Sequence, residues 1–159
     1  MADIAAFPTI TNVVVSEGHT LTYTGAGSLD IKPGMVVDYD STGVNMTAQA
    51  TLAASGDYPV GVAISNSDVS ASERFTVMID GVGNLANYDD TTAILIGDWV
   101  MTNDNAVGGT IGVASIAATA TTLAIIQANV VGQCLGTIAG GSYGPVRIAP
   151  CVITRANSS

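Results

Sequence analysis

The sequence predicts an all-β fold: a compact β-barrel or β-sandwich made from two pseudo-repeated β units, with little helix. Short runs rich in Val, Ile and Thr recur along all 159 residues and are bounded by Gly, Asn, Asp and Pro, which is typical of strands separated by turns. A short pattern of Gly and Val positions also occurs twice. Both observations favour a repeated β structure over alternating strands and helices.

Turn signals separate the expected strands along the whole chain. Examples are Glu17-Gly18, Lys32-Pro33-Gly34, Ser55-Gly56-Asp57 and Gly140-Gly141. Regular spacing of this kind is typical of sandwiches and of barrels, and it does not decide between them. The expected strands cover residues 12–17, 20–24, 35–39, 44–48, 60–64, 74–80, 99–102, 122–127, 130–135 and 145–153.

Helix-forming sequence is sparse. Residues 47–54 and 114–120 are rich in Ala, but both segments contain several Thr residues, whose branched side chains lower helix propensity. At most a single helical turn is expected, at residues 47–54.

The internal repetition predicts two β units that share one core. Each copy offers a Gly-containing apolar element, then a Val-Gly element, then an alternating strand. We expect residues 1–28 to form an N-terminal arm with the first hairpin, and residues 29–159 to form a single barrel or sandwich domain. Chance recurrence of Val-Gly pairs in a Val- and Gly-rich chain is the alternative. The first copy covers residues 31–37, 58–63 and 75–81, and the second covers residues 94–100, 129–135 and 144–150.

The charge of the chain disfavours two classes of partner. Acidic side chains number 13 against 4 basic ones, for a net charge of −9. The bases Lys32, Arg74, Arg147 and Arg155 are dispersed, whereas binding to a phosphate backbone needs clustered Lys and Arg. We therefore expect neither nucleic acid nor an anionic membrane as a partner. We also expect no signal peptide and no transmembrane helix.

The residue types that carry out catalysis are sparse. Nucleophilic catalysis usually requires a nucleophile beside a base, and the only histidine, His19, lies in an expected turn. Cys134 and Cys151 are expected to be free, because the cytosol keeps thiols reduced, although a disulfide between neighbouring strands stays open. Acid pairs drawn from Asp89-Asp90 and Asp98 arise by chance in so acidic a chain. We expect a protein that is not an enzyme and needs no cofactor.

One segment carries half of a calcium-loop pattern. Asp38, Asp40 and Thr42 stand at the first, third and fifth loop positions, and Gly43 follows at the sixth. The twelfth position is Gln49, where the pattern requires a bidentate Glu. A hairpin turn that contains Gly is therefore the favoured interpretation, and these three residues are the only weak candidates for a metal site.

The first ten residues carry several apolar side chains in a segment whose other side chains are mostly small. Ile4, Phe7, Pro8 and Ile10 are the candidates for a protein interface. They would belong to an arm that adds to the sheet edge of a neighbouring protein. A frayed terminus is the alternative.

Several short motifs together are similar to one family of proteins. They are Gly34-Met35-Val36-Val37, Val60-Gly61-Val62-Ala63, the strand at residues 75–81 and Gly97-Asp98-Trp99-Val100. In this order they resemble the small capsid cement (decoration) proteins of tailed bacteriophages. The resemblance covers about residues 31–113, and the chain departs from the pattern at residues 1–28 and 110–128.

The resemblance implies a structural protein that binds the outer surface of an assembled phage head. Such proteins sit as trimers at three-fold or quasi-three-fold positions and bridge neighbouring subunits of the major capsid protein. It therefore implies the major capsid protein and further copies of the chain as partners, and the virion as the location after synthesis in the host cytoplasm. The family has no catalytic residues to carry over.

Two other functions remain open from the sequence. The first is another structural role, such as a tail, fibre or surface-layer module. The second is a carbohydrate-binding β module, which would need exposed aromatic platforms, whereas only 5% of the residues are aromatic. Trp99 is the single Trp, and we expect it to pack in the core.

Overall fold

The computed structural model describes residues 6–26, 30–39, 49–52, 58–68, 70–103, 108–114 and 126–155. This part of the chain contains strands and no α-helix, so the all-β prediction is confirmed. None of it forms a helix long and apolar enough to cross a membrane. The strands are β1 (Val14–Ser16), β2 (Thr20–Gly25), β3 (Val36–Tyr39), β4 (Gln49–Leu52), β5 (Pro59–Ala63), β6 (Arg74–Met78), β7 (Gly81–Ala86), β8 (Trp99–Asn103), β9 (Thr110–Val113), β10 (Ile126–Cys134) and β11 (Tyr143–Arg155).

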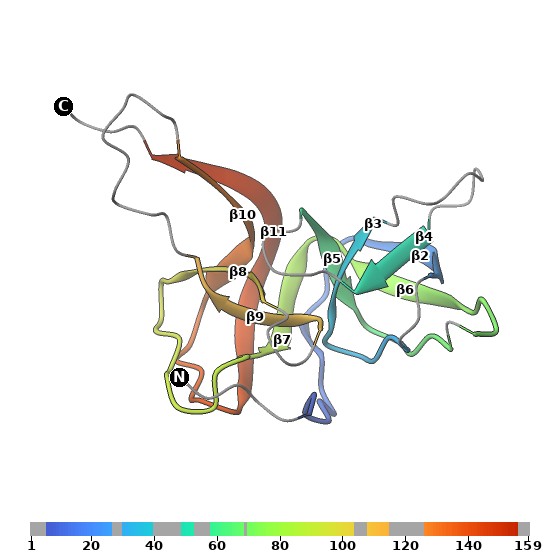
Figure 1. The fold of residues 1–159 in the computed structure, drawn as a ribbon, viewed down its shortest axis with the longest axis horizontal. Coiled ribbons are helices and arrows are strands. Elements are labelled where there is room, and N and C mark those ends of the chain that lie inside the picture. The colour runs from blue at the N-terminus through green and yellow to red at the C-terminus, as the bar shows by residue number, and fades with distance from the viewer. Residues whose placement is uncertain are drawn as a thin grey trace.

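The strands form two units that lie side by side (Figure 1). The first is a closed barrel with the strand order β2-β4-β3-β5-β6. All its neighbouring strands are antiparallel except β2 and β4. The second is a six-stranded sheet with the order β1-β7-β11-β10-β8-β9. We call β2–β6 the first repeat and β7–β11 the second repeat.

The two repeats have the same topology. Reading β2-β6-β5-β3-β4 around the barrel and adding five to each strand number gives β7-β11-β10-β8-β9, the order within the second sheet. The parallel pair that closes the barrel, Gly25 with Ala50, matches a parallel bridge between Asn87 and Ile111. This single bridge lies at the equivalent point of the second repeat. The expected duplication is present: the first repeat forms a closed barrel, and the second forms most of a six-stranded sheet.

Equivalent hydrogen bonds support this alignment. The Gly34 N–H donates to the Ala63 carbonyl at 2.7 Å, and the Gly97 N–H donates to the Cys134 carbonyl at 2.8 Å. Both glycines have a φ near +90°, at 91° and 90°, a conformation that favours Gly. The recurring Gly at these two positions therefore makes the same turn before β3 and before β8.

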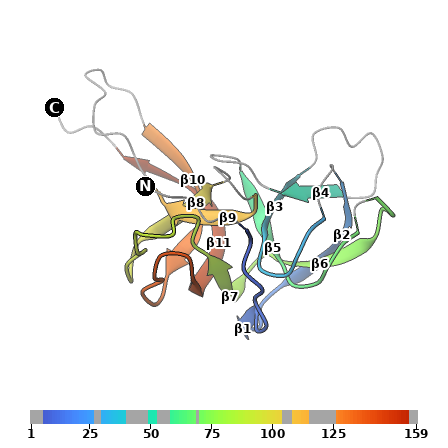
Figure 2. The ribbon, with the colours of Figure 1, turned by 60° about the horizontal axis from the view of Figure 1, so that its bottom comes forward.

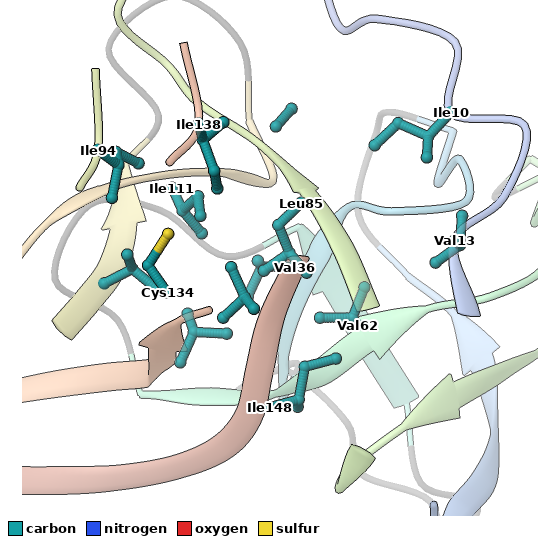
Figure 3. Packing of buried hydrophobic residues seen from close by; sticks show 14 of the residues in the cluster. Ile10, Val13, Val36, Val62, Leu85, Ile94, Ile111, Cys134, Ile138 and Ile148 are labelled. Carbon is teal, nitrogen blue, oxygen red and sulfur yellow. The ribbon is translucent and has the colours of Figure 1, made fainter. Parts of the chain in front are cut away.

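The core follows the duplication but is not one cluster. Strand alternation points one set of side chains into the first barrel, where Tyr23, Val37, Phe75 and Val77 are buried together. The larger cluster fills the second repeat and extends across the boundary into the first. Figure 3 shows most of this cluster. Its members are Ile10, Val13, Val36, Val62, Met78, Leu85, Ala86, Ile94, Val100, Ile111, Val131, Cys134, Ile138, Val146 and Ile148.

The N-terminal strands differ from the expected hairpin. β1 pairs with β7, whereas β2 pairs with β6 and β4, so the two strands do not pair with each other. The short turn at residues 17–19 lets the chain pass from one sheet to the other (Figure 2).

Three strand expectations also differ. Residues 49–52 form β4 rather than a helical turn, because the strand closes the barrel between β2 and β3. Residues 44–48 lie outside the described part. β10 runs without a break from Ile126 to Cys134 and so joins the end of the strand expected at residues 122–127 to the strand expected at 130–135. Residues 122–125 lie outside the described part. The expected strand at residues 74–80 ends at Met78, and β7 begins at Gly81.

The Val-Gly pairs of the two repeats have a steric cause. A Cβ added to Gly61 would run into the main-chain carbonyl of Met78, and one added to Gly132 would run into that of Arg147. Met78 lies on β6, which pairs with the strand of Gly61, and Arg147 lies on β11, which pairs with the strand of Gly132. The two residues occupy equivalent positions in the two repeats. Each pair of strands therefore approaches too closely for any side chain at this position.

We expect Gly132→Ala to lower the free energy of unfolding by about 3 kcal/mol, because a backbone carbonyl cannot move aside for the new methyl group. Gly97→Ala is the matched control. No atom lies within 4 Å of its added Cβ, so only its positive φ opposes the change, at about 1 kcal/mol. Urea unfolding monitored by circular dichroism measures both variants. Equal losses would contradict the close approach at Gly132.

Candidate docking surfaces

The expected N-terminal interface residues lie largely against their own chain. Ile10 is 6% exposed and belongs to the larger core cluster, with its Cδ1 filling the space where Gly34 lacks a side chain. Phe7 is partly buried against the same cluster. Ile10 therefore cannot face a partner, because the two repeats leave an apolar site that this side chain fills. Ile4 lies outside the described residues.

Pro8 lies in a shallow groove beside this segment. The groove has a volume of about 330 Å³ and includes Phe7, Lys32 and Asn66 among its lining residues. Pro8 is half-buried there. The groove offers apolar walls and one ammonium group and brings no catalytic side chains together.

The weak metal candidates are not assembled into a site within the described part of the chain. The Asp38 carboxylate accepts a hydrogen bond from the Tyr39 N–H at 2.7 Å, at the end of β3. Asp40 and Thr42 lie outside the described residues. Among the residues that are described, no three His, Cys, Asp or Glu side chains cluster as metal ligands.

The acids considered for catalysis hold turns. Asp89 is buried, and its Oδ1 accepts hydrogen bonds from the N–H and the hydroxyl of Thr91, both at 2.8 Å. Asp98 accepts from the Leu95 N–H at 2.9 Å. His19 Nδ1 lies 3.4 Å from Asp80 Oδ2 on the surface. Asp89 and Asp98 therefore each stabilise a turn.

Both cysteines are free, as expected. Cys134 is buried in the second repeat, where its thiol contacts the Gly136 carbonyl at 2.8 Å. Burial raises the pKa of this thiol, which keeps it protonated and unreactive. Cys151 is half-buried on β11.

Four exposed apolar side chains lie in the turn before β8, at the start of β8 and just after β10. The turn before β8 lies against the end of β10, where the Gln133 side chain donates a hydrogen bond to the Gly97 carbonyl at 2.9 Å. We call this surface the apolar face. Its members and their exposed fractions are Leu95 57%, Ile96 67%, Trp99 39% and Leu135 43%.

The position of Trp99 corrects the sequence-based expectation. Val100 is fully buried inside the second repeat, so alternation along β8 turns Trp99 outward. An apolar pair such as Trp99-Val100 does not reveal which member faces the core. In the first repeat, the residues equivalent to Trp99 and Val100 are Val36 and Val37. Because Val37 lies inside the first barrel, alignment of the repeats indicates that Val100 faces the core and Trp99 does not.

The β10–β11 hairpin forms the second surface. Beyond residue 148, β11 no longer pairs with β7, and β10 pairs with β8 only at Gly132 and Gln133. Residues 126–130 and 151–155 therefore form a two-stranded ribbon that leaves the body of the molecule in both views (Figures 1 and 2). Among the described strands, none pairs with the outer edge of β11 beyond residue 148. Val152 is 40% exposed on it.

Aromatic side chains lie at one end of the first barrel. Tyr23 and Tyr39 form an edge-to-face pair with ring centroids 6.0 Å apart. Burial, together with the hydrogen bond to Tyr39, raises the pKa of Tyr23, so its hydroxyl stays protonated. Tyr39 and Tyr58 are exposed, and exposed aromatic rings are one requirement of the carbohydrate-binding alternative.

We expect Ile10→Ala to lower the free energy of unfolding by about 3 kcal/mol, because it removes buried methyl groups from the main cluster. Chemical unfolding of the variant and the wild type measures the loss. Leu95→Ala, on the exposed apolar face, is the control and changes stability by less than about 0.5 kcal/mol. A loss at Ile10 no larger than that of the control would mean that Ile10 lies outside the core.

Asp89 makes the fold sensitive to acid. Hydrogen bonds, first of all from the Thr91 N–H, lower its pKa from 3.8 to about 2. A carboxylate with a lowered pKa in the folded state stabilises the fold above its unfolded pKa, and this contribution is lost as the pH falls from about 4 to about 2. Asp89→Asn should therefore flatten the fall in stability over this range. Urea unfolding at several pH values measures it, with the exposed Asp90→Asn as control; identical pH profiles for the two variants would contradict the assignment.

The comparisons with known proteins place the fold. No protein-family model and no curated protein matches this chain. Among solved structures, it is similar to the N base of the head fiber protein gp8.5 of bacteriophage phi29, with 15% sequence identity and a TM-score of 0.56. The match covers 82% of this chain and 93% of that chain. At this identity the similarity establishes a shared fold.

Proposed function

We propose that this chain is a structural protein of a phage virion: a cement protein that binds the outer surface of the head as a homotrimer and bridges neighbouring subunits of the major capsid protein. It is made in the host cytoplasm and joins the shell after the shell has assembled. It does no chemistry and needs no cofactor. The similarity of its fold to the base of a phage head fiber supports a virion role.

The observation that carries the proposal is the β10–β11 ribbon. An isolated two-stranded hairpin is at best marginally stable in water, yet here the two strands run on beyond their neighbours in the sheet. Beyond residue 148, no described strand pairs with the side of β11 that faces away from β10, and a strand from another protein can add to such an edge through main-chain hydrogen bonds. We infer that the ribbon is completed by a strand or loop of the capsid protein.

The charge of the chain fits the outside of a particle. The net charge of −9 disfavours contact with packaged DNA, since binding to phosphates needs clustered cations. It also keeps free copies apart in solution until specific contacts form. Three modest contacts per trimer then bind a shell far more tightly than one contact does.

A fibre module is the second candidate function, because the similar structure is itself the base of a head fiber. In that case the chain would anchor a longer appendage to the shell. Both functions require contact with a virion. They differ in whether the bound protein bridges capsid subunits or carries a further protein outward.

The direct test mixes the purified chain with purified expanded phage capsids and images the particles. We expect ordered density outside the shell at three-fold positions, touching at least two capsid subunits. Density that contacts a single subunit would favour the fibre module. Absence of binding, together with binding to a glycan array, would favour the carbohydrate-binding alternative and contradict the proposal.

We expect Val152→Asp to reduce capsid occupancy at least about tenfold, because it places a charge on the ribbon where a partner would cover it. Val15→Asp is the matched control: it makes the same change on β1, where the valine is 53% exposed against 40% for Val152. Quantified occupancy in particle images measures both variants. Equal occupancy of the two would exclude the ribbon as the contact.

A further inference from the structure

The two repeats present equivalent rows of side chains on their outer faces. In the first repeat, Val36, Val62 and Met78 are neighbours across β3, β5 and β6. We call them the first outer row. The equivalent residues of the second repeat are neighbours across β8, β10 and β11. They are Trp99, Gln133 and Arg147, and we call them the second outer row.

The first outer row is an interface inside the chain. All three side chains are fully buried, although they point away from the interior of their own barrel. They pack into the larger cluster, where Figure 3 shows Val36 and Val62 among Leu85 and Ile148 of the second repeat. The fold therefore uses this row to attach the first repeat to the second.

Among the described residues, none covers the second outer row in this way. Trp99 and Arg147 are exposed, and Gln133 is half-buried. Leu95, Ile96 and Leu135 of the apolar face are exposed beside it. Trp and Arg are the residue types that most often dominate the energy of protein interfaces. We propose that the second outer row binds the first repeat of another copy of this chain, in the way that the first outer row binds the second repeat.

The alignment of the repeats identifies the receiving surface. Met78 lies over Gly81 and Gly83 at the start of β7. Val77 and Val146 are equivalent, because each precedes one of the equivalent residues Met78 and Arg147. Val77 pairs with Leu21 and Val146 pairs with Gly83, so Leu21 is the equivalent of Gly83. The same offset makes His19 the equivalent of Gly81. Arg147 of one copy is thus expected over His19 and Leu21 of the next.

The receiving surface has the chemistry to bind this row. Leu21 is 48% exposed, although it lies on a barrel strand, and it offers an apolar contact. Asp80 lies beside His19, with 3.4 Å between its Oδ2 and the imidazole Nδ1, and both side chains are largely exposed. Among the described residues, Arg147 forms no ion pair within its own chain. The carboxylate of Asp80 complements the guanidinium of Arg147 across the contact.

This contact joins two different surfaces, so each copy can bind one neighbour through its second repeat and another through its first. In such a head-to-tail contact, every copy has both surfaces covered only if the copies close into a ring. The number of copies, three, rests on the proposed function. The choice of surfaces rests on the duplication alone.

The test is the mass of the full-length chain in solution without capsids, by size-exclusion chromatography with light scattering over a range of concentrations. The wild type is expected to form a closed oligomer. Arg147→Glu and Asp80→Arg should each raise the apparent dissociation constant at least about tenfold. The double variant, which exchanges the two charges, should regain most of the affinity. Trp99→Ala should raise the constant about 30-fold.

Arg74→Glu is the matched control. It makes the same charge change at an exposed position at the opposite end of β6 from Met78, and it should leave the mass unchanged. Far-UV circular dichroism checks that each variant keeps its strands. A wild type that stays monomeric at every concentration would overturn the inference, as would single variants that associate like the wild type, or a double variant that does not recover.

The result is separable from capsid binding. An oligomer that forms as described but leaves capsids bare contradicts the proposed function and supports this interface. A monomer that decorates capsids supports the proposed function and contradicts this interface.

Discussion

The burial of Val36, Val62 and Met78 between the two repeats is the contact on which the rest of the structure depends. These side chains lie on the outside of a closed barrel, where polar residues are usual, and yet none is exposed to solvent. Fully burying three apolar side chains contributes about 5–9 kcal/mol relative to leaving them exposed. Because native domains are stable by only about 5–15 kcal/mol, we infer that neither repeat is stable without the other.

The same contact explains the N-terminal segment. The boundary between the repeats leaves space beside Gly34, and Ile10 fills it. β1 then adds to the free edge of β7. The N-terminal segment thus stabilises the pair of repeats through Ile10 and β1.

The sequence predicted the fold class and the duplication, because both depend on local patterns. Val and Thr runs, turn residues and the repeated Gly positions are visible residue by residue. The orientation of Trp99 and the burial of Ile10 could not be predicted in this way. Each depends on which face of a strand the other repeat covers, and that is a property of the packing of distant segments.

The pairing of the first two strands could not be predicted from the sequence either. The sequence gives no direct sign that β1 and β2 part into different sheets, since a Glu-Gly turn is also typical of hairpins. Gly132 carried a usable signal, because its position matches Gly61 in the other repeat. The candidate docking surface on the second repeat depends on a difference between the repeats in three dimensions. The first outer row is covered by the second repeat, whereas Trp99 and Arg147 of the second outer row are exposed.

Hydrogen exchange of the full chain, alone and bound to capsids, tests the central claim that this is a docking module most directly. We predict that main-chain amides on the outer edge of β11 beyond residue 148 exchange fast in the free protein and become protected on capsids. Protection of the barrel strands should stay the same. Unchanged exchange along the ribbon in particles that carry the protein would contradict the account.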